Sequence, residues 1–161
     1  QPTLANFRPA HLTERADEMA FALRLARLRE RSLKYLRDGV FMRPPQLDVA
    51  EVTIPMSRLS IYAGQKEGLK TFEKKVSPVL AGAWRAPDGN LGVALVNIGE
   101  VTATITIRLN QNDSGLPERG TVFQVDEANR KPIGVFRDGR YEQSHTLAGQ
   151  DACLLEFSQD P

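Results

Sequence analysis

The sequence has few of the residue types that form disulfides, metal sites and catalytic nucleophiles. Its 161 residues include one cysteine, Cys153, and two histidines, His11 and His145. A single cysteine excludes an internal disulfide, and no spacing of these residues fits a metal site. We therefore expect no metal and no cofactor. A nucleophilic pair of Cys153 and His145 is formally open, but no third orienting group supports it.

Long hydrophobic runs and a strong net charge are also absent. No apolar stretch approaches the roughly 20 residues of a membrane span. The net charge is +1, which argues against nucleic acid or an anionic membrane as a partner. The charge is uneven, because residues 1–45 hold nine Lys/Arg against five Asp/Glu and the remainder holds twelve against fifteen.

Length and composition are those of one globular domain, or of one domain with an appendage. At this size roughly two-thirds of the unfolded surface can be buried, so a core forms without disulfide or metal. The chain begins at Gln1, and no signal-peptide pattern follows it. We expect a piece of a longer polypeptide, and the residues do not indicate a compartment.

Residues 13–37 predict one long helix. Thr13 is placed as its N-cap, and acidic residues follow where the helix dipole favours them. Gly39 suits the left-handed position after the helix, and Pro44-Pro45 prevents continuation. At 100° per residue two sides are apolar. One carries Phe21, Leu25, Leu28, Tyr35 and Leu36, and the other carries Ala16, Met19, Leu23, Ala26 and Leu33. A helix with two apolar sides needs neighbours on both.

From about residue 48 the pattern is that of β-strands. Alternating apolar and polar residues at 101–109 indicate a strand with one face in a core. Turn signals separate further strands expected near 49–54, 58–63, 76–86, 91–97, 121–126, 141–147 and 152–157. The fold class expected is mostly β: an antiparallel β-sandwich preceded by one long α-helix. We expect a helical segment at 1–45 and the sandwich at 46–161.

The stretch 79–97 predicts a central hairpin. Pro87, Asp88 and Gly89 fit a type I turn with a bulge, Gly89 being left-handed. The register then places Trp84 opposite Gly92. One face of this hairpin is aliphatic, and the other sets Trp84 above small residues. Both faces are apolar, so the hairpin should be covered on both sides, with the helix as one cover.

Three runs, in this order and spacing, carry a resemblance to a known family. They are Tyr35-Leu36-Arg37-Asp38-Gly39 with Met42-Arg43-Pro44-Pro45, then Ala83-Trp84-Arg85-Ala86-Pro87-Asp88-Gly89 with Leu91-Gly92-Val93-Ala94-Leu95-Val96-Asn97, and Asp151-Ala152-Cys153-Leu154-Leu155-Glu156-Phe157. They resemble the C-terminal end of large TIM-barrel glycoside-hydrolase-like proteins, in which a late barrel helix leads into a closing β-sandwich.

The resemblance implies a non-catalytic accessory domain that packs against and supports an upstream catalytic barrel of the same polypeptide. The motifs are structural, and in the family the catalytic carboxylates lie on barrel loops upstream. No family active-site residue is matched, so we expect this chain not to be an enzyme. The resemblance is compatible with an extracytoplasmic location. It would also explain a helix that is apolar on two sides, because part of its partner would be missing.

A carbohydrate-binding module is the first alternative. Trp84 is a candidate sugar contact, although its position over glycines favours buried packing. Tyr62 and Tyr141 are further candidates. A stand-alone hydrolase would need two carboxylates about 5 to 9 Å apart, whereas Asp126 and Glu127 are adjacent on opposite faces of a strand. The run 110–115 superficially resembles a calcium loop but lacks the closing Glu.

A protein-interaction domain is the second alternative. Arg24, Arg27, Arg31 and Lys34 form a basic stripe along the helix that could meet an acidic partner. A solvated helix face is the plainer interpretation of the same stripe. If the natural partner is missing, the isolated chain is expected to dimerise through Phe21, Leu25 and Leu28.

Overall fold

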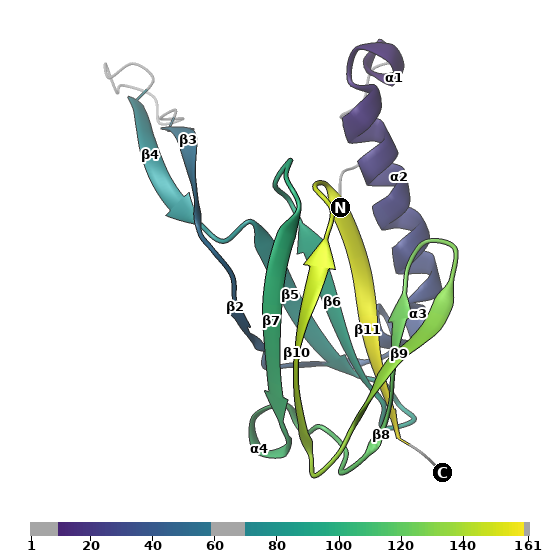
Figure 1. Cartoon of the computed structure of the whole chain (residues 1–161). Helices are drawn as coiled ribbons and strands as arrows, with labels where there is room; N and C mark the ends of the chain where they lie inside the picture. Colours follow the sequence, from purple (N-terminus) through teal and green to yellow (C-terminus); the bar gives the residue numbers. More distant parts are fainter. Residues whose placement is uncertain (1–9, 59–69, 160–161) are drawn as a thin grey trace, which may run out of the picture.

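The computed structural model describes residues 10–58 and 70–159 (Figure 1). The helical elements are α1 (His11–Glu14), α2 (Ala16–Arg31), α3 (Leu33–Leu36) and α4 (Gln111–Ser114). The strands are β1 (Val40–Met42), β2 (Gln46–Asp48), β3 (Val52–Arg58), β4 (Lys70–Val76), β5 (Val79–Arg85), β6 (Leu91–Asn97), β7 (Ala103–Asn110), β8 (Gly120–Val125), β9 (Arg130–Phe136), β10 (Arg140–Leu147) and β11 (Asp151–Gln159).

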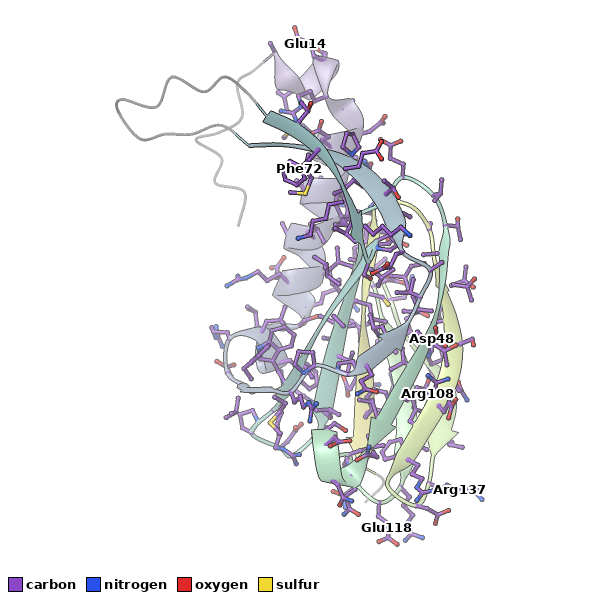
Figure 2. The ribbon with its side chains drawn as sticks, turned by 90° about the vertical axis from the view of Figure 1, so that its left-hand side faces the viewer. Glu14, Asp48, Phe72, Arg108, Glu118 and Arg137 are labelled. Carbon is purple, nitrogen blue, oxygen red and sulfur yellow. The ribbon has the colours of Figure 1, made fainter. Side chains whose placement is uncertain are left out.

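The prediction of a mostly β chain with antiparallel sheets is confirmed. A six-stranded sheet has the order β1-β5-β6-β11-β8-β9, and a three-stranded sheet has the order β10-β7-β2. All strand pairs among the described residues are antiparallel, including the separate ribbon β3-β4. The two larger sheets face each other across one core, which makes the body a β-sandwich (Figure 2).

The core is built by alternation along the strands. Ile105 and Ile107 of β7 point from the three-stranded sheet toward Val93, Leu155 and neighbouring side chains of the six-stranded sheet, all of them buried. The opposite face of the six-stranded sheet carries a second, smaller cluster with α2 and α3. The molecule therefore has three layers: helices, the six-stranded sheet and the three-stranded sheet (Figure 2).

The predicted hairpin is confirmed in register and in turn geometry. Trp84 pairs with Gly92 in the β5–β6 ladder. Gly89 has φ of 85°, and its amide donates to the carbonyl of Ala86 at 2.9 Å. Glycine fits there because other residues rarely adopt positive φ. Both faces of the hairpin contribute to hydrophobic clusters, as expected from its composition.

The predicted single helix is wrong in its continuity. Arg15 and Ser32 have non-helical backbone angles and divide the segment into α1, α2 and α3. Thr13 lies inside α1, where its hydroxyl donates to the carbonyl of Ala10, so it is not the N-cap of a long helix. Serine is a weaker helix former than the residues around it. Of the helices in the described residues, only α2 is long, with 16 residues.

Gly39 does not take the predicted left-handed conformation. Among the described glycines, positive φ occurs at Gly89, Gly115 and Gly139. Gly39 is instead required by close approach: a Cβ there would lie 2.9 Å from the carbonyl oxygen of Arg85 and closer still to that of Tyr35. The position joins the end of α3 to β1 without room for a side chain.

Strand prediction was incomplete at the sheet edges. The strands β1, β2, β4 and β9 were not expected, and Ser77-Pro78 breaks the strand predicted at 76–86. The strand predicted at 58–63 falls mostly on residues outside the described part. β1 lies before residue 45 yet pairs with β5, so the N-terminal segment contributes to the sheet that it precedes.

The ribbon β3-β4 extends away from the sandwich at the same end as the N-terminal half of α2 (Figure 1). Its apolar side chains Val52, Ile54 and Met56 alternate with Thr53, Pro55 and Ser57, and the partner of Met56 is Phe72. Phe72 is 45% exposed on this ribbon. No helix among the described residues is long and apolar enough to cross a membrane.

Candidate functional site

The face of the six-stranded sheet that carries the helices has the features of a functional surface. Strand alternation and register place Trp84, Ala94 and Leu154 on this face. Leu28 of α2 and Tyr35 of α3 are buried against it, and Leu25 packs beside them. The helices thus cover the part of the sheet around β6 and β11. This confirms the prediction that the helix covers the second face of the hairpin.

Two glycines shape the surface of the sheet under aromatic rings. A Cβ at Gly82 would lie 2.5 Å from the ring of Trp84, and a Cβ at Gly92 would lie 2.5 Å from the ring of Tyr35. Each ring therefore rests on a glycine of the sheet. The contact of Trp84 with Gly82 was predicted from the sequence. The contact of Tyr35 with Gly92, which holds α3 against the sheet, was not.

Toward the β1 edge, the same face is open. Phe41 is 61% exposed and Leu80 is 54% exposed, and Trp84 between them is half-buried. The rings of Phe41 and Trp84 meet edge to face with centroids 5.3 Å apart, a favourable arrangement for an aromatic pair. We call Phe41, Leu80 and Trp84 the open apolar face. Large apolar side chains gathered on one surface are typical of an interaction site.

The helix residues predicted as an interface are mostly engaged within the chain. Leu28 is only 6% exposed, and Phe21 and Leu25 are half-buried. Leu28 is therefore not available to a second copy, because it already packs on the sheet. The large apolar residue of α2 that is exposed is Leu23, on the other predicted side, at 51% exposure.

The basic stripe is directed partly at acidic and carbonyl groups of the same chain. Arg24 donates to the carbonyl of Gln150 at 2.6 Å, and Arg27 contacts Glu127 at 3.3 Å. Lys34 contacts Asp88 at 2.7 Å and Glu156 at 3.8 Å. Arg31 forms no ion pair or hydrogen bond with the described residues. The positive charge of residues 1–45 is thus balanced in part by the acidic loops of the sandwich.

The candidate sugar contacts do not lie together. Tyr141 is 4% exposed and faces the core, so the predicted exposed role for it is wrong. Its hydroxyl lies 2.8 Å from Nε2 of His145. Tyr62 falls outside the described residues. Of the candidates within the described residues, Trp84 is the one that is partly exposed, and the ring of Phe41 contacts it edge to face.

The nucleophilic pair considered from the sequence is not formed. Cys153 and His145 share no hydrogen bond, and the partner of His145 is Tyr141. Burial, followed by the charges of Asp151 and Asp126, raises the pKa of the Cys153 thiol to about 12. A thiol with that pKa is protonated at neutral pH and is a poor nucleophile. Burial also lowers the pKa of His145.

The carboxylates singled out from the sequence have local structural partners. Asp126 accepts hydrogen bonds from the amides of Ala128 and Asn129 in a turn after β8. Burial alone would raise its pKa, but these amide bonds and nearby cations outweigh burial and lower it. The region 110–115 forms the one-turn helix α4, capped by Asn110. Among the described residues, no three His, Cys, Asp or Glu side chains gather as metal ligands.

Two buried polar residues within the strands were not recognised from the sequence. Asn97 is fully buried, and its amide nitrogen donates to the carbonyls of Val101, Leu147 and Ala148. Glu156 is buried on the helix side of β11, where Arg130 binds it at 2.9 Å. Both residues stand in otherwise apolar strands, and this pattern in the sequence could have indicated a buried polar group.

The chain has one weak similarity to a solved structure and no match to a protein family or to a curated protein. Among solved structures, the chain is similar to a variant of a GH27 β-L-arabinopyranosidase from Geobacillus stearothermophilus, determined in complex with arabinose. The TM-score is 0.40 at 18% identity over 52% of this chain. The match spans 18% of the length of that enzyme, and a similarity at this level carries no argument.

Proposed function

We propose that this chain is a non-catalytic accessory domain of a glycoside-hydrolase-like polypeptide and that it docks on the catalytic domain through the open apolar face. The observation that carries the proposal is the exposure of Phe41 and Leu80 around Trp84, beside a helix that packs on the same sheet. The order of the sequence motifs, which resembles the C-terminal region of such proteins, supports the choice of partner.

Burial of the open apolar face would stabilise the contact. Removing a large apolar side chain from water is favourable by about 1.5–3 kcal/mol. Phe41 and Leu80 are each more than half exposed, so a neighbouring domain that covered them would gain this free energy at both positions.

The test compares the isolated chain with the native polypeptide. An immunoblot of the source should show a band several times larger than 17.9 kDa. Hydroxyl-radical footprinting should then label Phe41, Leu80 and Trp84 in the isolated chain and leave them protected in the longer polypeptide. Val101, exposed in the turn after β6, should be labelled equally in both.

Three results would overturn the proposal. A native band near 17.9 kDa would show that the native polypeptide has no upstream domain. Equal labelling of the open apolar face in both proteins would show that nothing docks there. Saturable glycan binding by the isolated chain, lost in Trp84→Ala with the fold intact, would instead indicate a carbohydrate-binding module.

A further inference from the structure

The three-stranded sheet ends at β10, an edge strand of eight residues that pairs with β7 in an unbroken register from Arg140 to Leu147. Beyond this ladder, the backbone hydrogen bond of residues 140–147 within the described part of the chain is the turn bond from Arg140 to Arg137. The carbonyl of Leu147 also accepts from the side chain of Asn97. In an antiparallel edge strand, alternate residues direct their amide and carbonyl groups away from the sheet. β10 therefore presents a row of main-chain donors and acceptors to solvent.

The other edges of the described sheets are short or protected. β1 and β2 have three residues each. β9 contains Pro132 and a bulge, β3 contains Pro55, and β4 carries exposed lysines at 74 and 75. Short length, proline, lysine and bulges are the means by which proteins prevent pairing at a sheet edge. β10 contains no proline, lysine or bulge, so its edge is able to accept another strand.

The edge of β10 is also accessible. Glu142, Gln143 and Ser144 are exposed in succession, although strand alternation turns only the first and third of them away from the core. Gln143 points to the core side together with Tyr141, whose hydroxyl donates to Oε1 of Gln143 at 3.2 Å. A side chain on the core side is exposed only where nothing covers the edge beside it. The space next to β10 is therefore open.

The six-stranded sheet continues past β10 without a covering strand. Gln124 pairs with both Leu155 and Lys131, so these three side chains are on the same, core-facing side of that sheet. Leu155 is buried in the core, whereas Gln124 is half-buried and Lys131 is exposed. Accordingly, the β8–β9 hairpin projects beyond β10 in Figure 1. A strand added at the edge of β10 would lie over this uncovered part of the sheet.

The surroundings of the edge define the segment that fits it. On the core side, an added strand would turn alternate side chains toward Gln124, Gln143 and His145, which need polar neighbours rather than apolar ones. On the solvent side it would lie beside Arg140 and Glu142, where opposite charges stabilise a cross-strand pair. A second copy fits less well, because two chains joined by their β10 edges would bring both projecting β8–β9 hairpins into the same space.

We propose that the edge of β10 binds an extended, polar polypeptide segment, which adds to the three-stranded sheet as a fourth, antiparallel strand. Main-chain hydrogen bonds supply the affinity in this mode of recognition, and alternate side chains supply the specificity. The edge shares no residue with the open apolar face, and the proposal does not depend on an upstream catalytic domain.

The probe is a synthetic peptide, acetyl-VTQTQRTE-amide, designed to run antiparallel to β10. In the matching register its arginine lies opposite Glu142 and its glutamate opposite Arg140. Titration of the ¹⁵N-labelled chain should give saturable NMR shifts at the amides of residues 140–147 and none at residues 40–42 of β1. N-methylation of every second peptide amide should weaken binding at least tenfold for the set that faces β10, because each methyl removes a main-chain donor. The other set should bind as the parent peptide does.

A charge exchange tests the register. Glu142→Arg should weaken binding of the peptide roughly threefold or more, and a peptide with glutamate in place of its arginine should restore it. The control is Thr104→Arg, at an exposed position of β7 in the same sheet but one strand away from the edge, and it should leave binding unchanged. Glu142 also pairs with Arg108 at 2.8 Å, so melting curves of both variants verify that the fold is retained.

Three results would overturn the proposal. The first is the absence of saturable shifts along β10. The second is equal weakening by both sets of N-methyl groups, since only a paired strand distinguishes alternate amides. The third is a dimer in sedimentation experiments that dissociates in Glu142→Arg, which would show that a second copy occupies the edge.

Discussion

Single glycines decide where aromatic rings can lie on the helix side of the six-stranded sheet. Gly82 lies beneath Trp84, and Gly92 lies beneath Tyr35. The sequence predicted the first contact because Trp84 and Gly82 are neighbours on one strand. It could not predict the second, since Tyr35 is far from Gly92 along the chain and no local pattern joins them.

At this residue scale we predict that Gly92→Ala destabilises the fold. The added methyl would lie 2.5 Å from the ring of Tyr35, so the ring and α3 must shift. Overpacking of this kind costs about 1–3 kcal/mol, which a urea titration measures. Gly134→Ala is the matched control, because a Cβ there meets only the flexible side chain of Gln143 at 3.5 Å. An equal loss of stability in both variants would contradict the account.

At the scale of elements, the β5–β6 turn is fastened to α3. Asp88 accepts a hydrogen bond from the amide of Asn90 within the turn and contacts Lys34 of α3 at 2.7 Å. Partial burial alone would raise the pKa of Asp88, but the Lys34 and Asn90 contacts outweigh burial and lower it. The turn and the contact therefore stabilise the ionised carboxylate.

The lowered pKa of Asp88 gives the stability a predictable pH dependence. A carboxyl whose pKa is lower in the folded state stabilises the fold above its unfolded pKa of about 3.9, and this contribution disappears as the pH falls through the folded pKa. Asp88→Asn should lower the free energy of unfolding by at most about 1 kcal/mol at pH 7, since the pair is partly exposed. The difference from the parent chain should shrink as the pH falls below about 4.

Chemical denaturation at several pH values measures this difference. Asp48→Asn serves as the control, because Asp48 is exposed and approaches Arg108 only to 3.8 Å. This variant should change the free energy of unfolding little at any of these pH values. A difference for Asp88→Asn that stays constant down to pH 3 would rule out the ion pair as its origin.

Elements with a strong local signal were predictable, and elements defined by their neighbours were not. The hairpin at 79–97 was predicted in register because Pro87, Asp88 and Gly89 fix its turn. The edge strands β1 and β9 were missed, since three residues give no period and Pro132 within β9 argues against a strand. Pro132 is tolerated because β9 is the edge of its sheet.

The candidate surface was only partly predictable for the same reason. Trp84 was recognised, but Phe41 became its neighbour only through the pairing of β1 with β5. Arg31 was recognised as part of a basic stripe, but only the fold brings Arg130 of β9 and Glu156 of β11 to the same open cavity. Sequence periodicity identifies the faces of an element, and tertiary packing decides which of them meet.

At the scale of the whole molecule, the helix layer is expected to be part of the folding unit. Leu28 and Tyr35 are buried on a sheet face that also holds Ala152 and Leu154, and β1 completes one edge of that sheet. Removing residues 1–45 would expose this face and delete β1. Burying each large apolar side chain contributes about 1.5–3 kcal/mol, a large share of the stability of a domain of this size.

We therefore predict that a chain of residues 46–161 does not fold to a native state. Its NMR spectrum should lose dispersion, and the fluorescence of Trp84, the one tryptophan in the sequence, should shift to longer wavelength as the ring meets water. Addition of a peptide of residues 10–45 should restore both signals, because it returns the missing layer to the sheet. A cooperative melt and a native-like spectrum for 46–161 alone would show instead that the sandwich folds without the helices, and that the boundary expected at residue 45 separates two independent units.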